Sequence, residues 1–542
     1  MIESTQELPA STGPDHAAEL PGRHRLRWRS GLCLLLLGIT GTVFANRMAA
    51  DDTDRMIRNF QGAGITILLM TVWWFVFSGV SLRLRTGLGI AGIVLVATFG
   101  LLTIRNVWFE GDMRPRLEFV WDAPSASEKA QKWLEANQPA TRKAEAAFTA
   151  MPSHLEITHQ DWPTYCGPGG NRVISEPLCS FNWNENPPKE LWRRPVGDAW
   201  SSFTIVGTSL FTQEQRGEQE CVVCYDAATG KEIWRREDQA RYESAQGAVG
   251  PRATPTVTSE AIFSLGATGI LNALHPATGE LLWQRNICRD AHADVLEWGM
   301  SGSPLIWNDT VIVDAGGTQN QAVIAYRVSD GSILWANGNH KAGYCTPRIE
   351  SIGGSPHLLV FHGDGLAGMD PDSGRLLWEY PWTNQYKINV AQPMRFDDQI
   401  FISSGYDSGC VLLDPTRLTD SRPAEVWPLN RNLKLKFNEA VQHGEFVYGL
   451  DDGILACIDV RTGERKWKAG RYRFGQLLLW GDRIVVQCES GAVAIVVATP
   501  EKHTEIARLE ALSDRTWNVP VVNRKRLFVR NASEAACYSL PE

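Results

Sequence analysis

A nine-residue unit that ends in tryptophan decides the fold of this chain. Its clearest copy is Asp226-Ala-Ala-Thr-Gly-Lys-Glu-Ile-Trp234. The Asp and Thr side chains bond the backbone of a turn, the Gly supplies the positive φ that the turn requires, and the following strand carries the Trp. Further copies keep the Gly-to-Trp spacing and end at Trp283, Trp335, Trp378 and Trp467. The repeat therefore predicts one supersecondary unit used many times.

Three weaker marks complete the series. Trp192 precedes the first full copy, Trp427 ends a shortened copy, and Ala507 stands in the Trp place of another. The marks at 192, 234, 283, 335, 378, 427, 467 and 507 are 40 to 52 residues apart, which suits a four-stranded blade. We expect an all-β, eight-bladed β-propeller whose tryptophans dock adjacent blades against each other. These structural tryptophans are Trp192, Trp234, Trp283, Trp335, Trp378, Trp427 and Trp467.

The two ends of the repeat region are expected to share one blade. Three strand-like stretches follow Ala507, and the strand that carries Trp192 supplies the fourth. Closing the ring in this way removes the exposed sheet edges. The propeller is predicted over residues 190–540, and the lack of alternating helices excludes an α/β barrel.

The N-terminal region is apolar enough to cross a membrane. Residues 31–45, 62–82 and 86–104 are nearly free of charge, so we expect three transmembrane helices within 31–104. Arg23, Arg25, Arg27 and Arg29 favour a cytoplasmic tail at 1–30, which puts the propeller outside the cytoplasm of a multi-pass cytoplasmic-membrane protein, on its periplasmic side. Val43-Phe-Ala45 leaves open a cleaved signal in place of the first span.

A linker is predicted between the spans and the ring, at 105–189. Residues 123–154 have a helical pattern that begins with a capping sequence at 125–128. Asp161-Trp-Pro163 and a Gly-rich stretch then lead into the ring. The net charge of −8 and the lack of a Lys/Arg tract outside the membrane-proximal one exclude a nucleic-acid partner.

Cysteines, histidines and paired carboxylates give no clear catalytic or metal motif. Cys166 and Cys179 bracket a Gly/Pro loop and are the expected disulfide pair. Cys221 and Cys224 form a lone C-x-x-C on a strand, where they face opposite sides. Asp451-Asp-Gly453 is interpreted as a hairpin turn. The histidines lack paired-ligand spacing, so no metal site is assigned.

The unit Asp-x-x-Thr-Gly-x-x-x-Trp resembles the tryptophan-docking repeat of the quinoprotein alcohol dehydrogenase-like superfamily, and Asp161-Trp-Pro163 resembles the lead-in of its propellers. Within it, the chain looks most like membrane-anchored bacterial PQQ-like repeat propellers, over about two-thirds of its length. That resemblance implies either a dehydrogenase with pyrroloquinoline quinone (PQQ) and Ca²⁺ on the propeller axis, or a binding scaffold without cofactor. Fold alone does not decide between them.

Two departures favour the scaffold. The adjacent Cys-Cys pair of many of these alcohol dehydrogenases is absent from the sequence, and about 350 residues over eight blades leave little chain for a lid. The alternative is a PQQ-dependent membrane-bound dehydrogenase that passes electrons to the quinone pool, because the membrane-bound glucose dehydrogenase also joins N-terminal spans to such a propeller. Expected partners are the membrane, other envelope proteins or a small ligand.

A ligand site is expected where the starts of the innermost strands converge on the axis. Arg252 could pair with a carboxylate, Trp298 or Tyr344 could stack on a flat ring, and Glu439 with Asn438 could bind a hard cation. A water-filled channel that tolerates polar residues is the other interpretation. The candidate residues are Ser202, Arg252, Ser301, Tyr344, Gln392, Asn438, Gln476 and Asn518, with Trp298 and Glu439 close by.

Overall fold

A computed structural model describes residues 27–49, 52–111, 113–137, 154–244 and 246–542. The chain divides into two compact units. One contains three N-terminal helices, and the other contains the chain from Asn106 onward. Each unit is described by itself.

The N-terminal unit consists of long apolar helices. They are α1 (Trp28–Arg47), α2 (Asp52–Val72), which continues into the π-helical turn η1 (Trp73–Phe77), and α3 (Leu82–Thr103). Three segments, 28–47, 54–77 and 82–103, are long and apolar enough to cross a membrane, as predicted. Small residues let α1 and α2 approach closely: Gly38 lies against Thr66, and Gly62 lies against Thr42. A side chain at either glycine would collide with the facing threonine.

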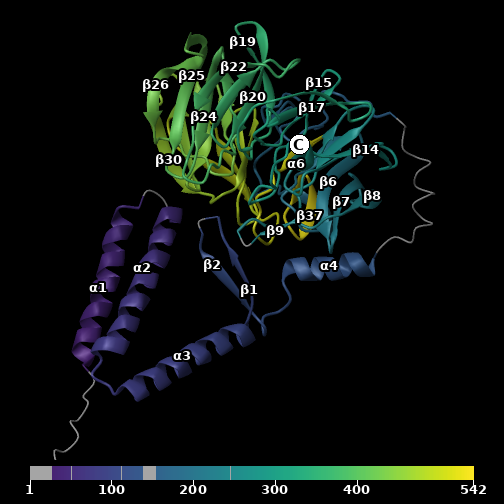
Figure 1. Cartoon of the computed structure of the whole chain (residues 1–542). Coiled ribbons are helices and arrows are strands. Elements are labelled where there is room, and N and C mark those ends of the chain that lie inside the picture. Colours follow the sequence, from purple (N-terminus) through teal and green to yellow (C-terminus); the bar gives the residue numbers. More distant parts are fainter. Residues whose placement is uncertain (1–26, 50–51, 112, 138–153, 245) are drawn as a thin grey trace, which may run out of the picture. The chain divides into compact units, whose positions relative to one another are not determined.

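Eight four-stranded antiparallel sheets, here called blades 1 to 8, confirm the predicted propeller (Figure 1). Blade 1 consists of β5 (Thr204–Val206), β6 (Ser209–Arg216), β7 (Gln219–Asp226) and β8 (Glu232–Gln239), and blade 2 consists of β11 (Thr256–Val257), β12 (Ile262–Leu265), β13 (Ile270–Leu274) and β14 (Leu281–Asn286). Blade 3 consists of β15 (Leu305–Trp307), β16 (Thr310–Asp314), β17 (Val323–Arg327) and β18 (Ile333–Asn337), and blade 4 consists of β19 (Arg348–Ile352), β20 (Ser355–His362), β21 (Gly365–Met369) and β22 (Leu376–Pro381).

Blade 5 consists of β23 (Met394–Phe396), β24 (Gln399–Ser404), β25 (Gly409–Thr419) and β26 (Arg422–Asn430), and blade 6 consists of β27 (Val441–His443), β28 (Phe446–Asp451), β29 (Ile454–Asp459) and β30 (Arg465–Arg471). Blade 7 consists of β31 (Gln476–Trp480), β32 (Arg483–Gln487), β33 (Val493–Val497) and β34 (Glu505–Leu509), and blade 8 consists of β35 (Val521–Asn523), β36 (Arg526–Arg530), β37 (Glu534–Ser539) and β4 (Lys189–Pro195). A short strand β3 (Val173–Ile174) adds to β31 in parallel. The pair β9 (Glu243–Ser244) and β10 (Ala248–Val249) and the short helix α6 (Ile287–Asp290) lie in connections.

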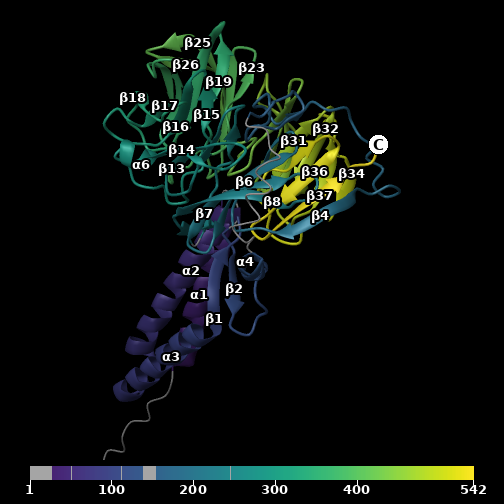
Figure 2. The ribbon, with the colours of Figure 1, turned by 90° about the vertical axis from the view of Figure 1, so that its right-hand side faces the viewer.

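Blade 8 closes the ring with strands from both ends of the repeat region. β4 pairs antiparallel with β37, with Trp192 opposite Cys537, and Figure 2 shows the two strands side by side. The predicted shared blade is therefore present. Because the first and last strands of the ring belong to one sheet, backbone hydrogen bonds hold the two ends together.

The marked tryptophans occupy one place in the ladder and pack on the next blade. Trp234 lies opposite Cys224, directly beside a register shift, and Ala507 has the same place opposite Ile495. The Trp234 indole covers Gly279 (φ +71°) in the following turn and donates to the carbonyl oxygen of Pro276 at 3.1 Å. The glycine is needed there, because a Cβ would enter the indole ring. Equivalent glycines lie under Trp192, Trp283, Trp335 and Trp427.

Trp378 differs from the others. Its Nε1 donates to Nδ1 of His357 in its own blade, at 3.0 Å. The turn of the next blade has no glycine, because β25 and β26 extend into a long hairpin that turns at Asp420 and Ser421, both at positive φ. Trp378 thus bonds within its own blade, whereas Trp467, whose following turn also has no glycine, donates to the carbonyl oxygen of Thr499 in blade 7 at 2.9 Å.

Before the ring, the chain forms a hairpin of β1 (Ile104–Phe109) and β2 (Pro115–Phe119) and then the helix α4 (Ala126–Ala136). Ser125 and Glu128 make the predicted capping box at the start of α4. α4 lies on blade 1, because Gln131 donates to the carbonyl oxygen of Gln215 at 2.8 Å. The later part of the predicted helical segment, at 138–153, lies outside the described residues.

The expected disulfide is wrong: Cys166 and Cys179 are both free, buried thiols. Cys166 points into the propeller axis, where its Sγ contacts Oε1 of Gln392 at 2.5 Å. The loop between the two cysteines is therefore not closed by a covalent bond. Cys221 and Cys224 are free as well, and they belong to different hydrophobic clusters on the two faces of blade 1, as predicted.

Candidate functional site

The Gly-rich stretch that precedes the ring crosses one end of the propeller axis. We call residues 161–174 the lead-in segment. Trp162 exchanges backbone hydrogen bonds with Ile205 of β5, and the carbonyl oxygen of Pro163 accepts from Val257 of β11. At its other end, β3 pairs with β31, with Val173 beside Leu479. The lead-in segment thus ties blades 1 and 2 to blade 7.

A buried ion pair forms where the lead-in segment meets the axis. Arg172 Nη2 lies 3.3 Å from Oε1 of Glu439, and only 3% and 5% of these side chains are exposed. The other carboxylate oxygen of Glu439 accepts from the backbone N–H of Gln392 at 2.6 Å. The Arg172 guanidinium also lies over the ring of Tyr165, at 4.8 Å. Burial raises the pKa of Cys166 to about 11, so this thiol stays protonated at neutral pH.

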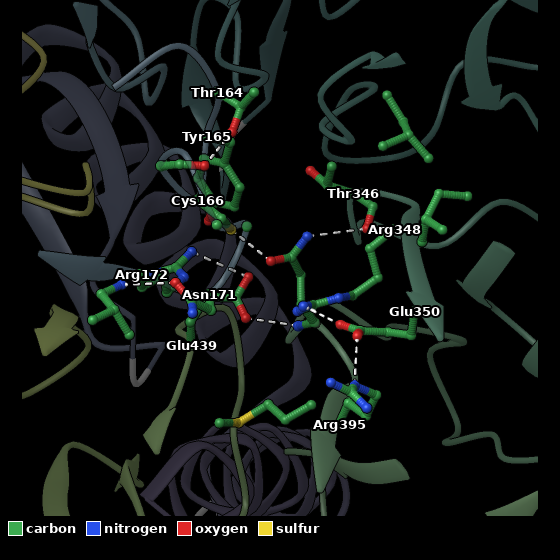
Figure 3. A pocket seen from close by; sticks show the side chains of 18 of the residues that line it. Thr164, Tyr165, Cys166, Asn171, Arg172, Thr346, Arg348, Glu350, Arg395 and Glu439 are labelled. Atoms are coloured by element: carbon green, nitrogen blue, oxygen red, sulfur yellow. Dashed lines mark hydrogen bonds and ion pairs between the residues drawn. The ribbon is translucent and has the colours of Figure 1, made fainter. Parts of the chain in front are cut away.

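Beside this ion pair lies a cavity of about 760 Å³, which we call the axial cavity (Figure 3). Arg348 and Arg395 both pair with Glu350 on its wall, and Arg395 Nε lies 3.2 Å from that carboxylate. Arg348 and Glu350 face the same side because they alternate along β19. Charged and apolar residues therefore line the same open cavity.

Five of the ten candidate residues lie in two separate places. Gln392 and Glu439 line the axial cavity. Arg252, Trp298 and Tyr344 form a separate group, in which the two aromatic rings are 5.6 Å apart. Arg252 donates to the backbone carbonyls of residues 247, 248 and 250, and burial lowers its pKa to about 10.

The remaining candidates bond one blade to the next. Gln476 donates to the carbonyl oxygens of Phe437 and Trp517, both at 3.1 Å. Asn518 donates to the carbonyl oxygen of Ser201 at 2.8 Å. Two others make similar bonds: Ser202 accepts from Val519 N–H, and Ser301 donates to Tyr344 O. Asn438 is the exception, because it accepts from Lys436 N–H in its own loop and donates to the carbonyl oxygen of Leu450 in its own blade. These polar side chains therefore stabilise the propeller by giving hydrogen-bond partners to buried backbone groups.

The other end of the axis is covered by the β1–β2 hairpin. Arg515 lies among the rings of Trp108, Trp200 and Trp517, at 4.4, 5.0 and 4.5 Å, and its Nη1 donates to the carbonyl oxygen of Phe109 at 2.8 Å. Burial lowers the pKa of Arg515 to about 10. Such an enclosed cation is held by the faces of the indoles.

Sequence reasoning missed Arg172, Arg348, Glu350, Arg395 and Arg515. The alternation of Arg348 and Glu350 along a strand was a readable signal for a charged face. Asp451 and Asp452 do form the expected turn, with Asp452 at φ +51°. Their carboxylates also pair with Lys468 and Lys434, each at 2.6 Å. Within the described ranges, no group of three or more His, Cys, Asp or Glu side chains could hold a metal ion.

The repeat, the eight blades and the lead-in segment can now be compared with known proteins. The family model described as "Outer membrane protein assembly factor BamB" matches residues 185–296 and 218–469, together more than half of the chain. The chain belongs to this PQQ-like propeller family. The family members from Moranella endobia and Burkholderia pseudomallei, both named outer membrane protein assembly factor BamB, are 23% and 22% identical to it. The alignments cover 58% and 63% of this chain and 91% and 85% of theirs.

A solved structure outside the assembly factors shares the fold. The quinohemoprotein alcohol dehydrogenase from Comamonas testosteroni aligns with a TM-score of 0.54 at 12% identity, over 74% of this chain and 85% of that one. At this identity the likeness concerns the fold alone. The family thus includes chains named as assembly factors, and its fold is shared with enzymes.

The group around Arg252, which the sequence suggested for the carboxylate of a ligand such as PQQ, does not fit this anionic quinone. The guanidinium of Arg252 is directed to three backbone carbonyls of its own loop. Glu439, the expected cation ligand, already faces Arg172. Arg252 and Glu439 are therefore each engaged with another group of the chain.

Proposed function

We propose that this protein is a membrane-anchored β-propeller outside the cytoplasm that binds envelope proteins as a rigid interaction scaffold. The observation that carries the proposal is a belt of exposed apolar side chains on the outer strands of blades 2 to 4. It consists of Leu281, Ile333 and Leu376, which are 38%, 42% and 46% exposed. Apolar residues that gather on a surface are typical of protein-binding sites.

The belt is distinctive when the blades are compared position by position. Each of its residues lies two places before the marked tryptophan of its blade. In the other five blades that place holds a charged residue: Glu190, Glu232, Glu425, Arg465 and Glu505. Charges on outer strands keep sheet edges from pairing with other chains. Blades 2 to 4 lack this charge at the matched place, which favours their outer strands as the docking surface.

The membrane anchor and the envelope location have separate support. Three helices have the length and composition to span a bilayer, and the arginines before the first one favour a cytoplasmic N-terminus. Relatives that align over most of their own length are named outer membrane protein assembly factors. An odd number of spans with a cytoplasmic N-terminus supports a propeller outside the cytoplasm.

Photo-crosslinking in cells tests the scaffold. A photoreactive residue at Leu334, beside the belt, is expected to give an adduct with an envelope protein. Lys466, at the matched place of blade 6, is the control, since both residues directly precede the marked tryptophan and are exposed. Ile333→Glu introduces the charge found in other blades, and we expect it to remove the adduct while changing the free energy of unfolding by less than about 0.5 kcal/mol. Equal adducts at both positions, or none, would contradict the proposal.

A titration separates the scaffold from the dehydrogenase. The full chain in detergent is titrated with PQQ and Ca²⁺ in a calorimeter, in parallel with Arg252→Ala. We expect Arg252→Ala to titrate like the unsubstituted protein, because the Arg252 guanidinium is engaged with the backbone carbonyls of its own loop. Saturable binding that Arg252→Ala abolishes would favour the quinone-dependent dehydrogenase instead.

A further inference from the structure

The axial cavity has guanidinium groups whose hydrogen bonds are incomplete. Only 3% of the Arg172 side chain is exposed, and its nitrogens make no hydrogen bond of good geometry with the described residues. Its ion pair with Glu439 uses Nη2 alone. The Nε of Arg348 is likewise buried without a hydrogen-bond partner among those residues. A buried N–H without an acceptor is destabilising, so both arginines would gain from an added oxyanion.

The buried charges of the cavity wall are balanced, so the case for an anion rests on the unsatisfied N–H groups. Arg172 and Arg348 are matched by Glu439 and Glu350. Arg395 and Asp397 are both exposed, where solvent screens their charges, and Arg395 Nη1 donates to the carbonyl oxygen of Asp397 at 2.8 Å. An oxyanion would supply acceptors to Arg172 and Arg348 that the described part of the chain does not.

Apolar side chains line the same cavity on the inner strands to either side of β19. They are Ile306 and Trp307 of β15 and Met394 and Phe396 of β23. The volume of about 760 Å³ falls within the usual range for small-molecule sites. The lining reaches Asp397 and Gly444, which lie in turns at the ends of inner strands, so a ligand can enter from that face. A carboxylate on an apolar body matches this mixed lining.

We propose that the axial cavity binds a small organic acid, with its carboxylate between Arg172 and Arg348 and its apolar body against Trp307 and Met394. The site is separate from the apolar belt and does not depend on it. It also differs from the group around Arg252, where the sequence suggested a ligand. Glu439 acts as an internal competitor, because it occupies one side of the Arg172 guanidinium in the free protein.

Calorimetric titration of the full chain in detergent with 3-phenylpropionate tests this site. We expect one saturable site with a Kd below about 1 mM, and no binding of the neutral amide of the same acid. Glu439→Gln is expected to tighten binding about fivefold or more, because the amide still accepts from Gln392 N–H while the competing charge is gone. Arg348→Gln is expected to weaken binding about tenfold.

Two controls distinguish a change in ligand binding from a change in folding. In Arg348→Gln, Glu350 keeps its ion pair with Arg395, so the lining of the cavity around Glu350 stays in place. Arg417→Gln, at a side chain that is 62% exposed on blade 5, should leave binding unchanged. Equal affinity for acid and amide, tighter binding of inorganic phosphate, or weaker binding in Glu439→Gln would overturn the proposal. Cross-linking at the apolar belt is measured independently, so failure here leaves the scaffold proposal standing.

Discussion

Replacing Arg172 by methionine is expected to destabilise the propeller by about 3–5 kcal/mol, because it leaves the carboxylate of Glu439 buried and unpaired. Glu439 is only 5% exposed, and Arg172 is the cation that faces it in the ion pair. The measurement is the thermal midpoint of the full chain in detergent, followed by calorimetry. The midpoint should fall by several degrees.

A second substitution identifies the cause. Adding Glu439→Gln to Arg172→Met removes the stranded charge, so most of the lost stability should return. The amide oxygen introduced at position 439 can still accept from the backbone N–H of Gln392, which keeps that contact in the double variant. A double variant as unstable as Arg172→Met alone would show that the packing of the arginine matters, and that its charge does not.

Trp234→Ala is expected to lower stability by about 3–5 kcal/mol, the usual cost of removing a buried aromatic side chain. The indole is 3% exposed, covers Gly279 of the next blade and donates to the carbonyl oxygen of Pro276. Its removal opens a cavity between blades 1 and 2. The same thermal measurement reports the change.

Trp121→Ala is the matched control, because this tryptophan is 66% exposed outside the ring. Its midpoint should stay close to that of the unsubstituted protein. Trp283→Ala, at the equivalent place of blade 2, should resemble Trp234→Ala. An unchanged midpoint for Trp234→Ala would contradict a docking role for the repeat tryptophans.

The propeller was predictable because its information is local and repeated. The turn and the tryptophan of each unit lie within nine residues, and the spacing of the marks counts the blades even where Ala507 replaces tryptophan. The membrane helices were predictable for a similar reason, since length and hydropathy are properties of one segment. The π-helical turn at Trp73–Phe77 was not predictable, because no pattern of length or hydropathy distinguishes it from the helix that it continues.

The axial cavity was not predictable, because it depends on contacts between distant residues. Arg172 meets Glu439 only after the lead-in segment has crossed the axis. That segment has no periodicity, and the cysteines at 166 and 179 suggested a closed loop where the chain in fact runs inward. The polar ring at the strand starts was visible in the sequence, but its bonds to neighbouring blades were not.

The crossing of the lead-in segment also sets an order of events during synthesis. A ribosome makes β3 and β4 before any blade exists, yet their partners, β31 and β37, come from residues 476–480 and 534–539. Both early strands must wait, with open edges, until nearly the whole chain has emerged. A prematurely terminated chain can build its middle blades but can never close. Only a chain that contains β31 and β37 can therefore close the ring, and truncated products keep unpaired strand edges that favour aggregation or degradation.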